Sequence, residues 1–212
     1  MVESFYYIIF VRNKYIKIMK TVKVVSEVPK LSITIDSHCE SPRQDSNVGY
    51  FITLSTRYNS PDSNNDLRTL IQETSNIAKN CENHIELITE HLEASGEEVL
   101  LILPISTYEH SGIQYSIGNK YGFEYSNNGF YIVTKESLEE IGSFSDIDVL
   151  TSYIEGEIEN YNKWVNNEIY RFELLDENGE FEDSRGGFYS LESIREQLPK
   201  SWVDECLSDY IK

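Results

Sequence analysis

Two patterns of hydrophobic residues alternate along this chain. The first is an alternation of apolar and polar residues, or a short apolar run, which is typical of β-strands. It occurs in eight segments: 22–24, 33–35, 50–54, 99–105, 113–117, 130–133, 169–175 and from Phe181 onward. The run 99–105 is continuously apolar, which predicts a central strand covered on both faces. The segment Ser126–Gly129 is rich in turn-forming residues, so we expect a loop there.

The second pattern places apolar residues three or four positions apart, which is the spacing of an amphipathic helix. It runs through 67–92, where Asn65 or Asp66 is expected as the N-cap. It predicts either one long helix or two helices that meet near Asn80. The same spacing recurs over 145–165. Shorter helices are expected at 134–142, 191–198 and 202–211.

This order of elements predicts an α+β fold, in which a mixed or antiparallel sheet packs against several helices. Residues 19–212 are expected to form a single acidic domain. Residues 1–18 contain an apolar run followed by basic residues, the reverse of the order in a secretory signal. We expect them to be an N-terminal extension outside the core, with a genuine first strand as the alternative.

The charge balance changes abruptly after the first thirty residues. The whole chain has 36 acidic and 18 basic residues, a formal net charge of −18. Residues 1–30 carry +4, whereas residues 31–212 combine 34 acids with 12 bases and carry −22. Such a negative surface is repelled by nucleic acid and by anionic membranes, and it is attracted to basic proteins. We therefore expect a basic protein partner and no direct contact with nucleic acid or membrane.

Cysteine usage and hydropathy favour the reducing cytoplasm. The three cysteines, Cys39, Cys81 and Cys206, are odd in number and far apart, so they do not form a disulfide framework. No apolar run approaches the roughly 18–20 residues that a membrane helix needs. A cytoplasmic location is the prediction that follows.

The sequence lacks the common motifs for metal binding and catalysis. Cys81, His84 and His91 share one predicted helix, but zinc-binding helices use tighter pairs, and no HExxH or CxxC motif is present. There is also no GxSxG motif and no GxxxxGK phosphate loop. We therefore expect no metal, no cofactor and no catalytic residue.

Carboxylates recur along one face of each of the two long helical segments. They are spaced four, four and three apart in the first segment and lie opposite the apolar stripe in the second: Glu82, Glu86, Glu90, Glu93, Asp148, Glu155 and Glu159. Like charges at helical spacing repel each other by about 0.2–0.5 kcal/mol per pair. Only Lys79 and Lys163 lie in or beside these segments to offset them. The uniform sign predicts surfaces that bind a basic partner, with an acidic surface kept for solubility as the alternative.

Five sequence blocks, in this order, resemble those of a known family. They are Glu40–Arg43 (ESPR), Tyr108–Gly112 (YEHSG), Asn128–Glu136 (NGFYIVTKE), Glu157–Trp164 (EIENYNKW) and Asp183–Tyr189 (DSRGGFY). They are similar to the ENPR, YxHSG, GFIYVTKE, EVExYDQYL and DSCWGFYG blocks of a family of hypothetical proteins of bacteriophages, plasmids and integrative elements. The chain has Arg185 and Gly186 where Cys-Trp is usual, and it therefore resembles a diverged copy.

The resemblance implies a set of candidate site residues and a biological setting. The polar residues of these blocks that match the family are Arg43, His110, Asp183 and Tyr189. Arg57 joins them, because Arg57-Tyr58 resembles the RRY that follows the ENPR block in the family. Each is a candidate for a function shared by the family, with a purely structural role as the alternative. Mobile elements of this kind act in the cytoplasm of a bacterial host.

Charge and resemblance together favour a protein that acts by binding. The leading interpretation is a phage or mobile-element accessory protein whose acidic faces mimic nucleic acid and inhibit a host defence or DNA-processing protein, in the manner of anti-CRISPR and anti-restriction proteins. Its expected partner is a basic, nucleic-acid-binding host protein. Two alternatives are a small enzyme with a site around His110 and Asp183, and an interaction domain of a larger assembly.

Overall fold

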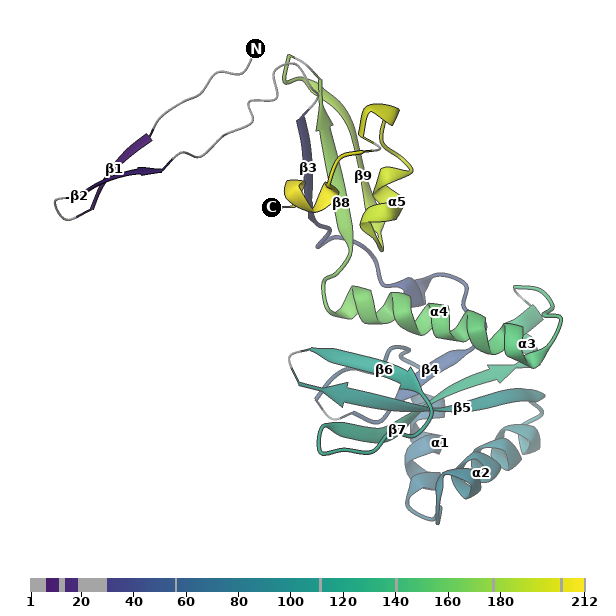
Figure 1. Cartoon of the computed structure of the whole chain (residues 1–212). Coiled ribbons are helices and arrows are strands. Elements are labelled where there is room, and N and C mark those ends of the chain that lie inside the picture. Colours follow the sequence, from purple (N-terminus) through teal and green to yellow (C-terminus); the bar gives the residue numbers. More distant parts are fainter. Residues whose placement is uncertain are drawn as a thin grey trace. The chain divides into compact units, whose positions relative to one another are not determined.

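The structure is a computed structural model that describes most of the chain from Lys30 onward and two strands before it. The described residues are 7–11, 14–18, 30–55, 57–110, 112–139, 141–176, 178–202 and 204–211. Their strands and helices confirm the predicted α+β class (Figure 1). None of the helices within these ranges is long and apolar enough to cross a membrane.

Contacts within the chain divide it into two compact units, whereas a single domain was expected for residues 19–212. The larger unit comprises residues 35–169. The smaller unit joins the chain up to Thr34 to the segment that begins at Tyr170. Each unit has a sheet and a hydrophobic core of its own, and hydrophobic periodicity does not tell which strands will share a sheet.

The first two strands, β1 (Tyr7–Val11) and β2 (Lys14–Ile18), pair with each other as an antiparallel two-stranded sheet. Residues 1–6 and 12–13 of the expected N-terminal extension lie outside the described residues. The strand expected at 22–24 lies outside them as well. That residues 1–18 are an extension outside the core stays a prediction.

A four-stranded antiparallel sheet forms the centre of the larger unit. Its spatial order is β4-β7-β5-β6. The strands are β4 (Tyr50–Thr53), β5 (Val99–Glu109), β6 (Ile113–Ile117) and β7 (Tyr125–Thr134). The central strand predicted at 99–105 is therefore confirmed as part of β5, which lies inside the sheet and continues to Glu109.

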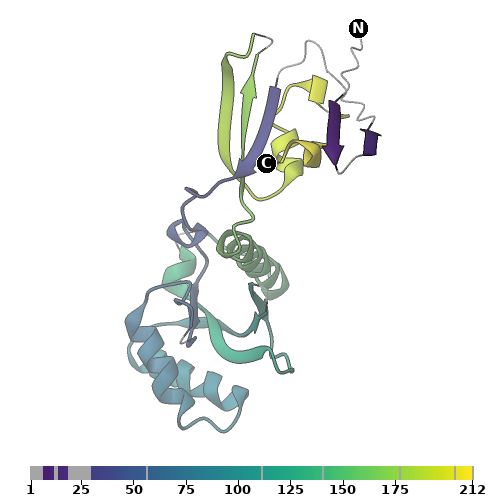
Figure 2. The same ribbon diagram turned by 90° about the vertical axis from the view of Figure 1, so that its left-hand side faces the viewer.

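Three helices cover the two faces of this sheet: α1 (Asn65–Ser75), α2 (Cys81–Ala94) and α4 (Ile147–Val165). Successive residues of a strand point to opposite faces. Ile52 and Ile132 therefore pack against α1 and α2, while their neighbours Phe51 and Tyr131 pack against the apolar stripe of α4. The result is a layer of strands between helices on either side (Figure 1 and Figure 2).

Each of these helices begins at a side chain that caps its first turn. Asn64, Asn80 and Asp146 accept hydrogen bonds from the backbone N–H three residues further on. The cap at Asn80 divides the segment 67–92 into two helices, which confirms that alternative. The cap of α1 lies slightly upstream of the expected position. A short helix, α3 (Lys135–Glu139), follows β7 directly.

The loop expected at Ser126–Gly129 is wrong, because these residues belong to β7. Asn127 ties β7 to β5 by accepting a hydrogen bond from the Ser106 hydroxyl at 2.6 Å. Gly129 passes so close to β4 that an added Cβ would lie 3.0 Å from Thr53 Cγ2. Residue types that favour turns are thus used inside a strand, where side-chain bonding and close packing override local preference.

The smaller unit is built on a sheet with the order β3-β8-β9. Its strands are β3 (Lys30–Ile35), β8 (Tyr170–Leu175) and β9 (Phe181–Phe188). They are followed by α5 (Leu191–Arg195) and by two 3₁₀ helices, Lys200–Trp202 and Leu207–Tyr210. The α-helices expected at 191–198 and 202–211 are therefore wrong in length and, for the second, in type. Pro199 separates the segments because it has no backbone N–H to donate.

Candidate functional site

The four glutamates of the first acidic row line the outer face of α2. Glu82, Glu86, Glu90 and Glu93 are all exposed. The opposite face of the helix is buried against the sheet. Within the described part of the chain, no ion pair reaches any of the four carboxylates.

The second acidic row lies on α4 and does not join the first. Asp148, Glu155 and Glu159 are exposed, but α4 and α2 cover opposite faces of the sheet (Figure 1). The two rows therefore lie on opposite sides of the unit and do not form one continuous acidic face. Glu159 is also partly neutralised, because its Oε1 lies 2.7 Å from Lys163 Nζ.

Few basic residues of the larger unit are available to neutralise the α2 row. Residues 35–169 hold 23 acidic and 7 basic residues, a formal net charge of −16. Several of these bases pair with carboxylates that do not belong to α2: Arg43, Arg57, Lys135 and Lys163. The α2 row is left uncompensated as a result.

Arg43, a candidate from the family resemblance, is buried inside the larger unit. Its side chain is 4% exposed, and each of its five N–H donors has an acceptor. Nε and Nη2 donate to the two oxygens of Asp62 at 2.8 and 2.7 Å, and Nη1 donates to Glu157 at 2.9 Å. Asn47 Oδ1 and the Gly49 carbonyl accept the remaining bonds. Arg43 therefore has no donor left for a ligand.

The surroundings of Arg43 keep it charged and keep a neighbouring tyrosine protonated. Burial alone would lower the pKa of Arg43, but the hydrogen bonds and negative charge of Asp62 outweigh burial and raise this pKa overall. Tyr131 donates its hydroxyl to Glu157. Burial raises the pKa of Tyr131 above its ordinary value, so the hydroxyl stays a donor. The network holds together the segment of Arg43, the edge of β4 and α4.

Arg57 and His110 lie on the surface of the same unit. Arg57 is 73% exposed, and its Nη1 lies 3.6 Å from Glu109 Oε2. His110 is 64% exposed, and its Nδ1 lies 2.5 Å from Glu124 Oε1. Neither side chain is among the partners of buried Arg43. The structure therefore does not join Arg43 to either of them in one site.

Asp183 and Tyr189 belong to the smaller unit. Asp183 lies in β9, where it accepts a hydrogen bond from the backbone of Ser184 and pairs with Arg185 at 3.2 Å. Tyr189 directly follows β9 and is half-buried. His110 lies in the larger unit, so the enzyme alternative takes its two named residues from different units.

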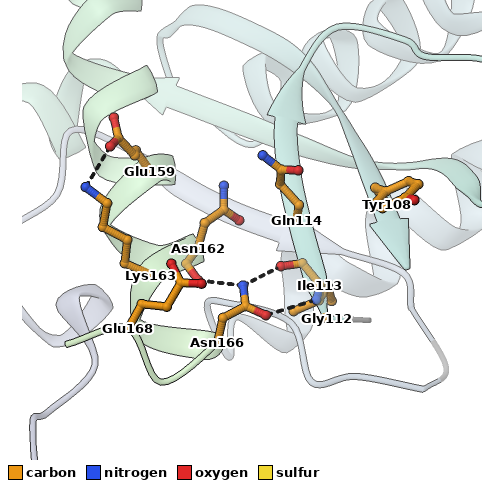
Figure 3. Close-up of a pocket in the computed structure, with 9 residues that line it drawn as sticks. All are labelled: Tyr108, Gly112, Ile113, Gln114, Glu159, Asn162, Lys163, Asn166 and Glu168. Atoms are coloured by element: carbon orange, nitrogen blue, oxygen red, sulfur yellow. Dashed lines mark hydrogen bonds and ion pairs between the residues drawn. The ribbon is translucent and has the colours of Figure 1, made fainter. Parts of the chain in front are cut away.

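A hollow of about 400 Å³ lies between α4 and the edge strand β6. Figure 3 shows Glu159 and Lys163 of α4 on one side, with Gln114 of β6 across from them. Lys163 is the basic residue of this lining and is already paired with Glu159. Glu168 adds a further carboxylate. The hollow therefore has no uncommitted positive charge with which to select an anion.

Two asparagines, Asn162 of α4 and Asn166 at its C-terminal cap, close the free edge of β6 beside this hollow. Asn166 Oδ1 accepts a hydrogen bond from the Ile113 N–H at 3.2 Å, and its Nδ2 donates to the Ile113 carbonyl at 2.7 Å (Figure 3). Asn162 makes the same two bonds to Tyr115, at 2.8 and 2.9 Å. Each side-chain amide replaces the backbone of a neighbouring strand, so this edge is closed to strand addition.

The residues considered for metal binding on α2 do not form a ligand set. His84 is tied to α1, because its Nε2 lies 2.9 Å from Thr74 Oγ1 and 3.1 Å from the Ile71 carbonyl. Across the described ranges, no group of three or more His, Cys, Asp or Glu side chains is placed to hold a metal ion.

The sequence analysis missed the residues that hold these sites together. Asp62 and Glu157 bind Arg43 although they lie 19 and 114 residues away in the sequence, and no local sequence pattern predicts such a contact. The sequence does contain a signal for the closure of the β6 edge, because Asn162 and Asn166 are four positions apart and border the apolar stripe of α4. What the sequence alone lacks is the position of β6 against that helix.

Comparisons with protein-family models, with curated proteins and with solved structures find no match to this chain. The resemblance to the mobile-element family therefore stays a prediction that rests on the sequence blocks. A function has to be argued from the surfaces described above.

Proposed function

We propose that this protein acts by binding, as an acidic mimic of nucleic acid that occupies the binding channel of a basic protein. The observation that carries the proposal is the exposed and uncompensated row on α2: Glu82, Glu86, Glu90 and Glu93. A surface of uniform negative sign attracts rows of Lys and Arg, and proteins that bind DNA present such rows to the phosphates.

The spacing of the row supports mimicry. Eleven positions separate Glu82 from Glu93. An α-helix rises about 1.5 Å per residue, so the row is about 16 Å long. One strand of B-DNA carries a phosphate about every 3.4 Å along the axis, or about five over that length. Four carboxylates therefore give α2 a linear charge density close to that of one DNA strand.

The α4 row has a different part in this proposal. Asp148 and Glu155 lie on the opposite face of the sheet from α2, so a partner that grips α2 does not reach them at the same time. They add to the negative field that guides a basic partner to the molecule. We therefore assign direct partner contact to the α2 row.

The resemblance to proteins of phages and plasmids supports a particular class of target. Mobile elements are attacked by host nucleases that must hold DNA in a basic channel. We propose a host defence or DNA-processing protein in the bacterial cytoplasm as the partner, with restriction endonucleases and RNA-guided nucleases as the first candidates. Inhibition would be steric and electrostatic and would need no catalytic turnover.

A nuclease panel with charge-neutralised variants tests this proposal. Restriction endonucleases and RNA-guided nucleases cleave a plasmid with the protein added at increasing concentration. The test variant replaces the four α2 glutamates by glutamine. The matched control neutralises four exposed acids on the α4 side, so that net charge changes equally: Glu136→Gln, Glu139→Gln, Asp148→Asn and Glu155→Gln.

We expect at least one nuclease to be inhibited by the native chain and by the control, and the α2 variant to lose inhibition at least tenfold. Inhibition should also weaken between about 50 and 200 mM salt, because each charged contact is screened. Failure to inhibit any nuclease of the panel would contradict the proposal. Equal loss of inhibition in both variants would also contradict it, since net charge and not the α2 row would then be responsible.

A further inference from the structure

A second hollow of the larger unit, of about 530 Å³, lies between the α1–α2 connection and segments of β5, β7 and the β6–β7 connection. Its volume is within the range of small-molecule sites. Polar and aromatic side chains line it from both sides, among them Lys79, Asn80, His84, Asn119, Tyr121 and Phe130.

This hollow is free of carboxylates, although the unit around it has a formal net charge of −16. None of the described residues that line it is Asp or Glu. Three other hollows of the same unit each contain at least one: Glu159 and Glu168, Asp45 and Asp62, and Asp36. Its charged residue is Lys79, and no ion pair between described residues reaches that side chain. An anion therefore meets a lysine here that is unpaired among the described residues, and it meets at least one carboxylate at each of the other hollows.

The sheet side of the hollow is held in place by hydrogen bonds. Asn127 Nδ2 donates to the Lys120 carbonyl at 2.9 Å, and its Oδ1 accepts from the Lys120 N–H at 3.1 Å. The Gly118 N–H donates to the Pro104 carbonyl at 2.7 Å. These bonds fix the connection that carries Tyr121, so the wall is formed before any ligand arrives.

The two sides offer complementary recognition groups. His84 donates through Nε2 to the Ile71 carbonyl at 3.1 Å, which leaves Nδ1 of the neutral ring as an acceptor. The side-chain amide of Asn119 can both donate and accept. Tyr121 is 89% exposed and presents an aromatic ring at the edge of the hollow, while Phe130 is buried beneath it. Polar edges, an aromatic face and one cation thus meet in one place.

We propose that this hollow binds a mononucleotide, a ligand with a planar ring, hydrogen-bonding edges and an anionic group. Lys79 pairs with the phosphate, and His84 and Asn119 bond to the edges of the base. Tyr121 stacks on the face of the base, an interaction that is open to every base because each has a π-face. The site is separate from the acidic row on α2 and does not depend on the function proposed for that row.

Calorimetric titration of the full chain tests this site directly. The probes are the four ribonucleoside monophosphates and three fragments: adenosine lacks the phosphate, ribose 5-phosphate lacks the base, and inorganic phosphate lacks both base and ribose. About 150 mM salt screens the net charge of the protein beyond roughly 8 Å. The variants are Lys79→Met and Tyr121→Ala, both at exposed positions. Lys135→Met is the matched control, because it removes one positive charge from an exposed lysine outside the hollow.

We expect at least one nucleotide to bind at least tenfold more tightly than any fragment. Lys79→Met should weaken that binding about tenfold or more, which is the loss expected for a hydrogen bond to a charged group. Tyr121→Ala should weaken it as well, and Lys135→Met should leave it unchanged. The proposal is overturned if no nucleotide binds at millimolar concentration. It is also overturned if phosphate alone binds as tightly as the nucleotides, or if Lys79→Met and Lys135→Met have equal effects.

Discussion

The guanidinium of Arg43 connects three separate parts of the larger unit. It binds Asp62 beside β4, Glu157 on α4 and the Gly49 carbonyl ahead of β4. Asp62 and Glu157 are themselves 15% and 12% exposed, so each depends on Arg43 for its counter-charge. The contacts of Arg43 therefore support a structural role for this residue and not a function shared by the family.

Removing Arg43 should destabilise the larger unit strongly. Arg43→Met leaves two nearly buried carboxylates without a counter-charge, and breaking a buried ion pair in this way costs about 3–5 kcal/mol of unfolding free energy. Arg57→Met is the control, because Arg57 is 73% exposed and its ion pair is worth at most about 1 kcal/mol. Urea unfolding measures both. A loss below about 1 kcal/mol in Arg43→Met would show that the network is not a stabilising one.

His84 should make stability depend on pH in a defined direction. Burial lowers the pKa of His84, and the hydrogen bond to the Ile71 carbonyl opposes this only in part. The unfolded chain, with an ordinary pKa of about 6.5, therefore binds the proton more readily than the folded chain. Stability should fall as the pH drops below about 6.5, until the lowered folded-state pKa is passed.

A comparison of the native chain with His84→Gln isolates this contribution. Urea unfolding at pH 7.5 and 5.5 should show a smaller loss of stability in the variant than in the native chain. Other titrating groups affect both proteins alike and cancel in the difference. An identical pH dependence in the two proteins would mean that His84 titrates equally in the folded and unfolded states.

At the scale of the elements, periodicity predicted most helices and strands, because their apolar residues face one core. The segment 67–92 and the run 99–105 are the clearest cases. It failed at Ser126–Gly129, where the close approach of Gly129 to Thr53 is a contact between strands and not a local property. The lengths of the C-terminal helices failed for a related reason, since short 3₁₀ turns leave little periodic signal.

The edge of β6 is the element whose closure is most open to test. Replacing Asn162 and Asn166 together by alanine leaves the backbone groups of Ile113 and Tyr115 without these partners. Each unsatisfied buried group costs about 1–3 kcal/mol, and an uncovered strand edge invites pairing with a second chain. We expect a marked loss in urea stability, and oligomers in size-exclusion chromatography.

Asn160→Ala is the control for this pair, because Asn160 lies on the exposed side of α4. It should change neither stability nor elution volume appreciably. If the double variant elutes at the same volume as the control and is equally stable, the two asparagines do not protect the edge.

At the scale of the whole molecule, the sequence predicted that the surface is negatively charged. It did not predict that the acidic rows on α2 and α4 lie on opposite sides of the larger unit. The helical spacing of the glutamates was readable, and their exposure follows from the apolar stripe on the other side of each helix. That α2 and α4 cover opposite faces of one sheet depends on strand order, which no local pattern encodes. The same holds for the pairing of Arg43 with distant carboxylates. The partner surface that we propose is therefore narrower than the charge count indicates, and its centre is α2.

Competition with DNA for a nuclease that the protein inhibits tests the central claim most directly. The affinity of the labelled protein for that nuclease is measured at increasing concentrations of duplex DNA. If the α2 row occupies the DNA channel, the apparent dissociation constant rises in proportion to DNA concentration, and no complex contains both. An affinity that does not change with DNA, or a stable complex of nuclease, DNA and this protein, would contradict nucleic-acid mimicry.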